Sequence, residues 1–339
     1  MAMGLLMRLE AAAVIAVIAV TLALAPGGAR AQLSSSYYAK TCPGLEYNVN
    51  DVLQSALIKD SRIGASLLRM HFHDCFVQGC DASITLVDTP TFTGEQTARP
   101  NVNSIRGFDI MEQIKARVES ICPGVVSCAD ILALVARDAV ISAYGPYWKV
   151  KYGRRDSTTA CLSCSNTQIP SPAGNVTALT AAFAAKGLDQ KDMTTLSGAH
   201  TFGKAHCKVF SSRLTNFSGT GAPDPTLNPT YRATLLQECP QGVSTSVVVN
   251  FDLTTPFLFD NAYYTNLFND DGLLTSDQTL YSEGGPTATI VTNYGSTQKD
   301  FFKQFAKSMV KLGKITPLTG SQGEIRKERT AGGQGRQPI

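Results

Sequence analysis

The stretch Arg69–Ser83 reads RMHFHDCFVQGCDAS and combines an arginine, two histidines and two cysteines, each of which is next to an aspartate. If its first half is helical, Arg69, Phe72 and His73 lie at i, i+3 and i+4 and share one face. A guanidinium one turn away disfavours the charged imidazole, which suits acid/base catalysis beside a developing anion. On spacing alone, a helix end with one core and one surface histidine is the alternative interpretation.

The second half of this stretch offers oxygen atoms around a glycine. Side-chain and carbonyl oxygens are the ligands that Ca²⁺ prefers. The candidate donors are Asp74, Val77, Gly79, Asp81 and Ser83. An acidic turn without metal, closed by a disulfide between Cys75 and Cys80, is equally compatible with the spacing.

The chain has four histidines, and the two outside this stretch lie in LSGAHTFGKAHC, residues 196–207. His200 follows an expected helix, where it could ligate a metal, whereas His206 has no evident role. An oxygen-rich run, Asp252–Asn261, and the isolated acid Asp277 lie further on. The residues alone therefore indicate a His/Arg pair, a separate ligand histidine and two Ca²⁺-like loops, and they name no cofactor.

Composition indicates a globular protein. Of the 339 residues 43% are hydrophobic and 17% are charged, with a formal net charge of +3. This is too apolar for a disordered chain and too weakly basic for a dedicated nucleic-acid binder.

The N-terminus predicts export. Arg8 precedes the apolar run Ala11–Ala25, which is short for a membrane span, and Ala29-Arg30-Ala31 resembles a signal-peptidase site. We expect cleavage after Ala31, an uncleaved anchor being the alternative. In an exported protein most of the nine cysteines form disulfides, and at least one is left unpaired. The sequons at Asn175 and Asn216 then become candidate glycosylation sites.

Apolar periodicity predicts a mainly α protein with long loops. The only strand-like piece is Trp148–Tyr152, Ser127 and Thr297 are expected N-caps, and the loops Asp88–Asn103 and Tyr152–Gly174 exceed ordinary connector length. The expected helices are Leu45–Asp60, Ile63–His73, Gly107–Ile121, Cys128–Ala143, Asn175–Lys186, Asp189–Gly198, Pro229–Gln237, Asn261–Asn269, Pro286–Asn293 and Thr297–Leu312.

The motifs RMHFHDCFVQGCDAS, SCADILALVARDAV, GRRDS, LSGAHTFGKAHC and FDNAYYTNL, in this order, resemble the secreted plant (class III) haem peroxidases. The resemblance runs from Gln32 to about Arg326. It implies the plant haem peroxidase fold, with about ten helices in distal and proximal halves that sandwich one haem b. After the predicted signal peptide over 1–31, the resemblance implies a peroxidase domain over 32–326, and the tail over 327–339 departs from the family's pattern.

The resemblance also assigns roles to site residues. His200 resembles the axial ligand of the haem iron, and Asp277 its hydrogen-bond partner. On the distal side His73 resembles the acid/base, Arg69 the transition-state stabiliser and Asn101 the residue that orients His73. Glu95 resembles the acid of this network, and Pro170 the residue whose carbonyl contacts substrates.

Two Ca²⁺ sites and three disulfides follow from the same resemblance. The first Ca²⁺ site maps to the donors given above, and the second to Thr201, Asp252, Thr255, Leu258 and Asp260. The disulfides map to Cys42–Cys122, Cys75–Cys80 and Cys207–Cys239. The family's fourth bridge would join Cys128 to a position where this chain has Arg329, so Cys128 is expected to be unpaired. Cys161 and Cys164 are additional cysteines, and our hypothesis is that they form a local bridge with each other.

The expected function is reduction of hydrogen peroxide with oxidation of small phenolic donors in two one-electron steps. The resemblance implies a monomer in the cell wall or apoplast, without nucleic-acid or membrane partners after signal cleavage. A haem-poor, Ca²⁺-bound interaction protein is the alternative from another class. A zinc hydrolase is disfavoured, since no H-E-x-x-H motif occurs and the CLSC motif at Cys161–Cys164 lacks partners at zinc spacing.

Overall fold

The computed structural model describes residues 33–240 and 246–328, and these described residues belong to one compact unit. The expected signal peptide, Arg329 and most of the expected tail lie outside the described residues. Within them the chain forms thirteen α-helices, labelled α2 to α14, and a two-stranded sheet. None of the described helices is long and apolar enough to span a bilayer.

Four helices form the N-terminal half: α2 (Leu45–Lys59), α3 (Ile63–Phe76), α4 (Phe108–Ile121) and α5 (Cys128–Ser142). Helix α5 is buried from Cys128 to Val140, so it forms the centre of the core. Its N-cap is Ser127, as expected, whose side chain accepts a hydrogen bond from the Asp130 amide at 3.1 Å. Helix α3 packs along α5.

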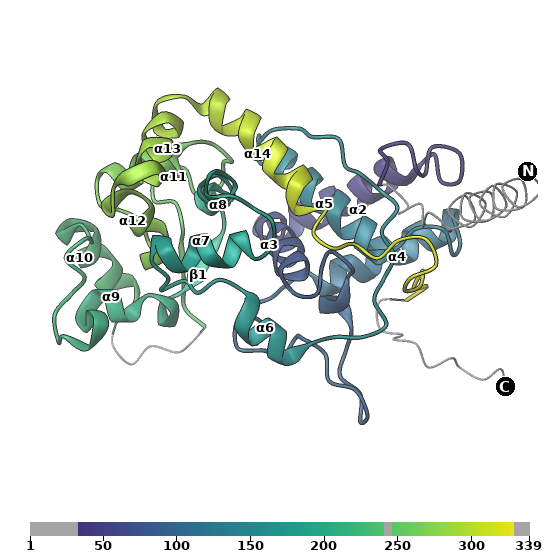
Figure 1. The fold of residues 1–339 in the computed structure, drawn as a ribbon, viewed down its shortest axis with the longest axis horizontal. Helices are drawn as coiled ribbons and strands as arrows, with labels where there is room; N and C mark the ends of the chain where they lie inside the picture. The colour runs from purple at the N-terminus through teal and green to yellow at the C-terminus, as the bar shows by residue number, and fades with distance from the viewer. Residues whose placement is uncertain (1–32, 241–245, 329–339) are drawn as a thin grey trace, which may run out of the picture. The chain divides into compact units, whose positions relative to one another are not determined.

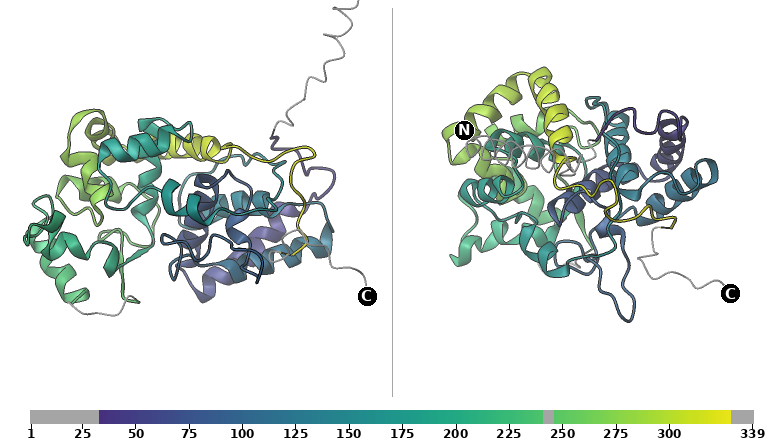
Figure 2. Two further views of the ribbon diagram at one scale, coloured as in Figure 1. Left: turned by 60° about the horizontal axis from the view of Figure 1, so that its bottom comes forward. Right: turned by 45° about the vertical axis from the view of Figure 1, so that its right-hand side comes forward.

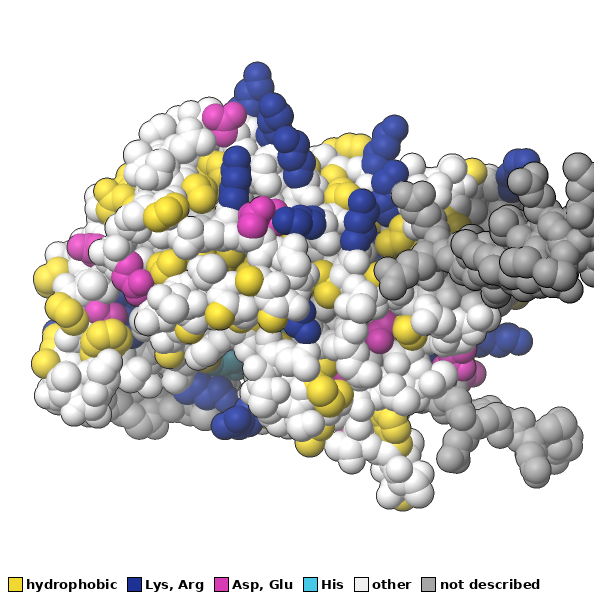
Figure 3. Space-filling view, viewed as in Figure 1, with side chains coloured by type: hydrophobic (Ala, Val, Ile, Leu, Met, Phe, Trp, Pro, Cys, Tyr) yellow, Lys and Arg dark blue, Asp and Glu magenta, His cyan; other side chains and the backbone are white. Residues whose placement is uncertain are grey.

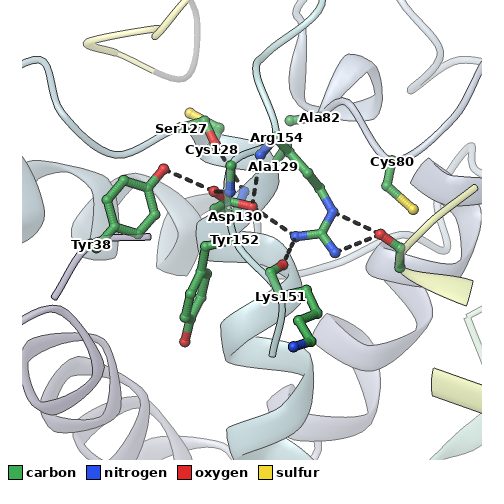
Figure 4. Close-up of polar contacts among 12 residues, drawn as sticks. Tyr38, Cys80, Ala82, Ser127, Cys128, Ala129, Asp130, Lys151, Tyr152 and Arg154 are labelled. Atoms are coloured by element: carbon green, nitrogen blue, oxygen red, sulfur yellow. Dashed lines mark hydrogen bonds and ion pairs between the residues drawn. The ribbon is translucent and has the colours of Figure 1, made fainter. Parts of the chain in front are cut away.

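A buried ion pair between Asp130 and Arg154 links α5 to the C-terminal end of α14. Figure 4 shows Asp130 between Tyr38 and Arg154. The carboxylate accepts from Arg154 Nη1 at 2.7 Å and from the Tyr38 hydroxyl at 2.8 Å. Arg154 Nε also donates to the Gly313 carbonyl at 2.9 Å, at the end of α14. Because these groups hydrogen-bond one another, the cost of burying two charges is offset.

The C-terminal half contains most of the remaining helices, and Figures 1 and 2 show α9–α13 grouped away from α2–α5. Strands β1 (Lys204–His206) and β2 (Val248–Asn250) pair antiparallel, with Ala205 opposite Val249. They join α9 and α10 in a second, smaller core. The helices are α6 (Leu162–Gln168), α7 (Val176–Ala184), α8 (Gln190–Ser197), α9 (Ser211–Thr215), α10 (Pro229–Glu238), α11 (Ala262–Phe268), α12 (Thr275–Ser282), α13 (Gly285–Ser296) and α14 (Gln298–Leu312).

Helix α14 is strongly amphipathic. Phe301, Phe305 and Met309 are buried, whereas the opposite face carries exposed lysines. Basic side chains line this edge of the molecule in the space-filling view (Figure 3). The exposed lysines of α14 are Lys299, Lys303, Lys307 and Lys311.

The ten expected helices are all present, with ends within about three residues of those predicted. Three further helices, α6, α9 and α12, were not expected, and the mainly α architecture is as predicted. The predicted strand Trp148–Tyr152 is wrong, because of these residues only Tyr152 forms a bridge, to Ser34. Thr297 occupies the N-cap of α14, but its side chain makes no capping hydrogen bond.

Four disulfides tie the described chain. Three are those implied by the resemblance: Cys42–Cys122, Cys75–Cys80 and Cys207–Cys239. The fourth is Cys161–Cys164, which confirms the hypothesis of a local bridge. Cys128 is a buried free thiol.

Candidate active site

Helix α3 presents the first histidine of the candidate site. His73 is 5% exposed, and its Nδ1 lies 2.6 Å from Asn101 Oδ1. Burial, reinforced by the Arg69 charge, holds the pKa of His73 well below its ordinary value. His73 is therefore a neutral imidazole, as the Arg/His spacing predicts.

The Arg69 guanidinium is fixed by the turn that carries Asn101. Its Nη2 donates to the Pro100 carbonyl at 2.7 Å, and its Nη1 to the Ser104 carbonyl at 3.0 Å. Burial lowers the pKa of Arg69 to about 10, so the group stays charged at neutral pH. The site thus places a fixed positive charge one helical turn from a neutral base.

Asn101 is held by two further hydrogen bonds. Its Nδ2 donates to the Glu95 carbonyl at 2.9 Å and to Ser165 Oγ at 3.0 Å. Burial raises the pKa of the Glu95 carboxyl to about 7. The sequence analysis missed Ser165, because a contact between residues 64 positions apart leaves no signal in local spacing.

A second histidine lies after α8. His200 Nδ1 is 2.8 Å from Asp277 Oδ1, at the first turn of α12. Asp277 is buried and also accepts from the Tyr263 hydroxyl at 3.1 Å and the Leu274 amide at 3.0 Å. The His200 ring stacks on Phe251, with centroids 4.1 Å apart. The structure thus brings together His200 and Asp277, the two residues that the resemblance pairs.

These surroundings fit a haem group. Each histidine uses Nδ1 for its partner, and among the described residues no hydrogen bond engages Nε2 of His73 or His200. The His200 side chain is 35% exposed although its partner Asp277 is only 2% exposed, so the ring can reach a ligand. A histidine whose other nitrogen donates to a carboxylate is the usual arrangement of a metal-ligating imidazole.

The first candidate Ca²⁺ loop contains buried oxygens that lack partners. Asp74 Oδ1 and Ser83 Oγ are both buried without a hydrogen bond. Burial, together with the nearby Asp81 and Glu95, raises the pKa of Asp74 well above its ordinary value, and burial raises that of Asp81 to about 6. A bound cation would satisfy the orphaned oxygens and offset the repulsion between the carboxylates.

The backbone of this loop is shaped for the site. Gln78, Gly79 and Ala82 all have positive φ. At Gly79 a Cβ would lie 2.4 Å from the Thr316 carbonyl, so only glycine allows this close approach.

The second candidate Ca²⁺ site lies directly after His200. Thr201 Oγ1 is 3.2 Å from Asp252 Oδ2 and 3.1 Å from Asp260 Oδ1. Burial raises the pKa of Asp252, while its other oxygen accepts from the Thr255 amide at 3.1 Å. Leu258, the fifth expected ligand, donates its amide to the Thr255 carbonyl.

In the described part of the chain, no three His, Cys, Asp or Glu side chains gather as a metal site. A cation in either loop would therefore also need hydroxyl and carbonyl ligands, as Ca²⁺ accepts. The other two histidines lie outside these arrangements. His71 is buried near Cys75, and burial lowers its pKa to about 3, whereas His206 lies on β1.

A helical fold with a neutral His/Arg pair on one helix and a separate His/carboxylate pair is typical of haem peroxidases. The family model described as "Peroxidase" matches residues 49–297. Peroxidase 15 of Ipomoea batatas is 55% identical over 298 residues, which are 87% of this chain and 91% of that protein. Peroxidase 4 of Vitis vinifera is 51% identical over 308 residues, which are 90% of this chain and 94% of that protein.

Peroxidase 54 of Arabidopsis thaliana is 50% identical over 303 residues, covering 89% of this chain and 85% of that protein. The chain therefore belongs to the peroxidase family, among the plant (class III) haem peroxidases. It is an enzyme that uses hydrogen peroxide to oxidise a reductant, and its family implies a haem cofactor.

Proposed function

We propose that His73 is the acid/base that moves the peroxide proton. The 2.6 Å contact between His73 Nδ1 and Asn101 Oδ1 carries this assignment, because an amide oxygen only accepts and Nδ1 must therefore hold the hydrogen. Nε2 is then the unprotonated nitrogen. It takes a proton from one peroxide oxygen and returns it to the other.

Arg69 acts on the charge that builds as the O–O bond breaks. Its guanidinium is held by the Pro100 and Ser104 carbonyls before substrate arrives. A fixed cation in a largely buried site stabilises a developing anion without reorganisation.

His200 would hold haem b through Nε2, and Asp277 would orient it by accepting from Nδ1. The bound haem supplies the redox chemistry, while this chain binds, orients and moves protons. Two one-electron oxidations of small phenolic donors complete the cycle. Pro170, half-buried between α6 and α7, is our candidate for the carbonyl that contacts these donors.

Two Ca²⁺ ions would support the two halves of the site. Their ligands are those assigned in the sequence analysis, and the orphaned Asp74 and Ser83 oxygens support the first site. Because Asp74 follows His73 directly and Thr201 follows His200, each cation would stiffen the backbone beside one histidine.

We also propose that the mature protein is a single domain over 32–326, after removal of a signal peptide. It would act as a monomer in the cell wall or apoplast. Asn175 and Asn216 would carry glycans. Both asparagines are exposed. Asn175 Oδ1 accepts a hydrogen bond from the Ala178 amide, and Asn216 Oδ1 accepts one from the Gly221 amide. Nδ2 of each side chain is therefore left for a glycan.

Loading the mature chain with haem and Ca²⁺ tests this function. We expect a Soret band and peroxide-dependent turnover of guaiacol, and we expect His200→Ala to lose the Soret band or shift it strongly. His206→Ala is the matched control, because it removes a histidine outside both pairs. A parent that takes up no haem, or a His200→Ala variant with the parent's spectrum, would contradict the assignment.

A further inference from the structure

Helix α6, which Figure 1 shows close to α3, contacts the turn that carries Asn101. The Cys161 amide donates to Glu95 Oε1 at 3.1 Å. The Arg99 amide donates to Asn166 Oδ1 at 2.8 Å, and Asn101 Nδ2 donates to Ser165 Oγ at 3.0 Å. Three hydrogen bonds thus connect residues 161–166 with residues 95–101.

The Glu95 carbonyl, which can only accept, determines which end of the Asn101 amide faces His73, and the Ser165 hydroxyl holds the amide in that position. Both residues are buried away from bulk water, since Ser165 is 0% exposed and Asn101 is 2% exposed. Nδ2 carries two hydrogens, which go to the Glu95 carbonyl and to Ser165 Oγ. The Oδ1 end must therefore face His73, and a flipped amide would place its donors against the His73 Nδ1 hydrogen.

The Cys161–Cys164 disulfide in turn holds Ser165. Cys161 is the N-cap of α6, and its Sγ accepts from the Cys164 amide at 3.1 Å. Helix α6 has only seven residues, and so short a helix is not stable without external support. The bridge closes its first turn immediately before Ser165.

We propose that Ser165 is a positioning residue for the peroxide reaction. Held by α6 and its disulfide, it takes the second N–H of Asn101 and so fixes the amide that orients His73. This rests on the proposed role of His73. Neither Ser165 nor the bridge touches the reacting atoms, so both act only through Asn101.

The test compares Ser165→Ala with Ser163→Ala in the haem-loaded, Ca²⁺-bound enzyme. Ser163 lies on the same helix and is exposed; its hydroxyl lies 3.5 Å from Cys161 Sγ and makes no contact with Asn101 among the described residues. For Ser165→Ala we expect kcat/KM for peroxide to fall about five- to tenfold, with kcat/KM for the reductant within about twofold of the parent. Ser163→Ala should match the parent in both.

Hydrogen exchange provides a readout independent of activity. The amides of Asn101, Val102, Ser104 and Ile105 bond within the turn. In Ser165→Ala we expect them to exchange at least about threefold faster, while the α14 amides keep their rates. The double variant Cys161→Ser/Cys164→Ser should show the same two effects. When Ser165→Ala is combined with this double variant, kcat/KM for peroxide should fall by less than the product of the two separate fold-losses.

Unchanged exchange in the turn, or unchanged kcat/KM for peroxide, in Ser165→Ala would overturn the proposal. An equal loss in both kinetic constants would also overturn it, since that indicates general damage. If the loaded parent itself does not react with peroxide, the proposed function fails, whereas the exchange rates still decide whether Ser165 holds Asn101.

Discussion

At the scale of single residues, environment rather than identity separates the four histidines. The i, i+4 spacing of Arg69 and His73 on a helix was readable in the sequence, and the structure confirms that Arg69 lowers the His73 pKa. The roles of Asn101 and Asp277 came only from the resemblance. Their contacts join residues 28 and 77 positions apart, and no local pattern encodes them.

Asp138 predicts a pH-dependent stability. Its carboxyl is buried beside Arg137 and Glu46, and burial raises its pKa from 3.8 to about 6. A raised folded-state pKa means that the folded protein binds the proton more tightly than the unfolded chain. The resulting stability is therefore full below pH about 4 and is lost as pH rises through about 6.

Asp138→Asn removes this dependence. Relative to the variant, the parent should lose up to about 3 kcal/mol of unfolding free energy between pH 4 and pH 7, at about 1.4 kcal/mol per pKa unit. Urea unfolding of both proteins across this range measures the difference. If the difference in unfolding free energy between parent and variant is constant with pH, or changes in the opposite direction, the pKa assignment is wrong.

At the scale of elements, long periodic segments were predictable and short ones were not. The ten expected helices carry an apolar face that periodicity detects. Helix α9 has five residues and α6 seven, too few turns for a periodic signal, and contacts made after folding decide their conformation. The strand-like alternation of Trp148–Tyr152 reflects one buried face of an extended segment that pairs only at Tyr152.

Hydrogen bonds tie the C-terminal segment to α5, where the resemblance implies a disulfide from Cys128 that this chain lacks the partner cysteine to form. Arg326 is 2% exposed, and its guanidinium donates to Thr85 Oγ1 at 2.8 Å and the Ser157 carbonyl at 2.9 Å. Its amide, like that of Cys128, donates to Asp156 Oδ2 at 3.0 Å. The Asp156 carboxylate thus joins the end of the chain to the start of α5, the helix from which the absent bridge would begin.

Arg326→Ala should lower stability by about 2–4 kcal/mol, because it leaves buried acceptors without their donor. We expect the thermal midpoint to fall by about 4–8 °C. The exposed Lys327→Ala, one residue further on, is the matched control and should change it by less than about 1 °C. Equal midpoints for the two variants would exclude the stabilising role of Arg326.

At the scale of the whole molecule, the proposed cations join both halves of the site to the fold. Chelation of Ca²⁺ should lower the thermal midpoint, since the buried Asp74 and Asp81 carboxylates lose their counter-charge. At a free Ca²⁺ concentration one hundred times Kd, each occupied site should raise the free energy of unfolding by about 2.7 kcal/mol. Calorimetry with and without chelator measures this effect, and Asp74→Asn should reduce the response. An identical midpoint in both conditions would contradict the Ca²⁺ assignment.

The central claim is that His73, held neutral by its buried site and oriented by Asn101, moves the peroxide proton. Rapid mixing of haem-loaded His73→Leu with hydrogen peroxide, followed at the Soret band, tests it most directly. We expect the rate constant to fall about 100- to 10,000-fold while haem stays bound, because general acid/base catalysis typically contributes a factor of that size. His71→Leu, which alters the buried histidine two residues away on α3, is the control and should react at close to the parent rate. A His73→Leu enzyme that consumes peroxide at the parent rate would contradict the account.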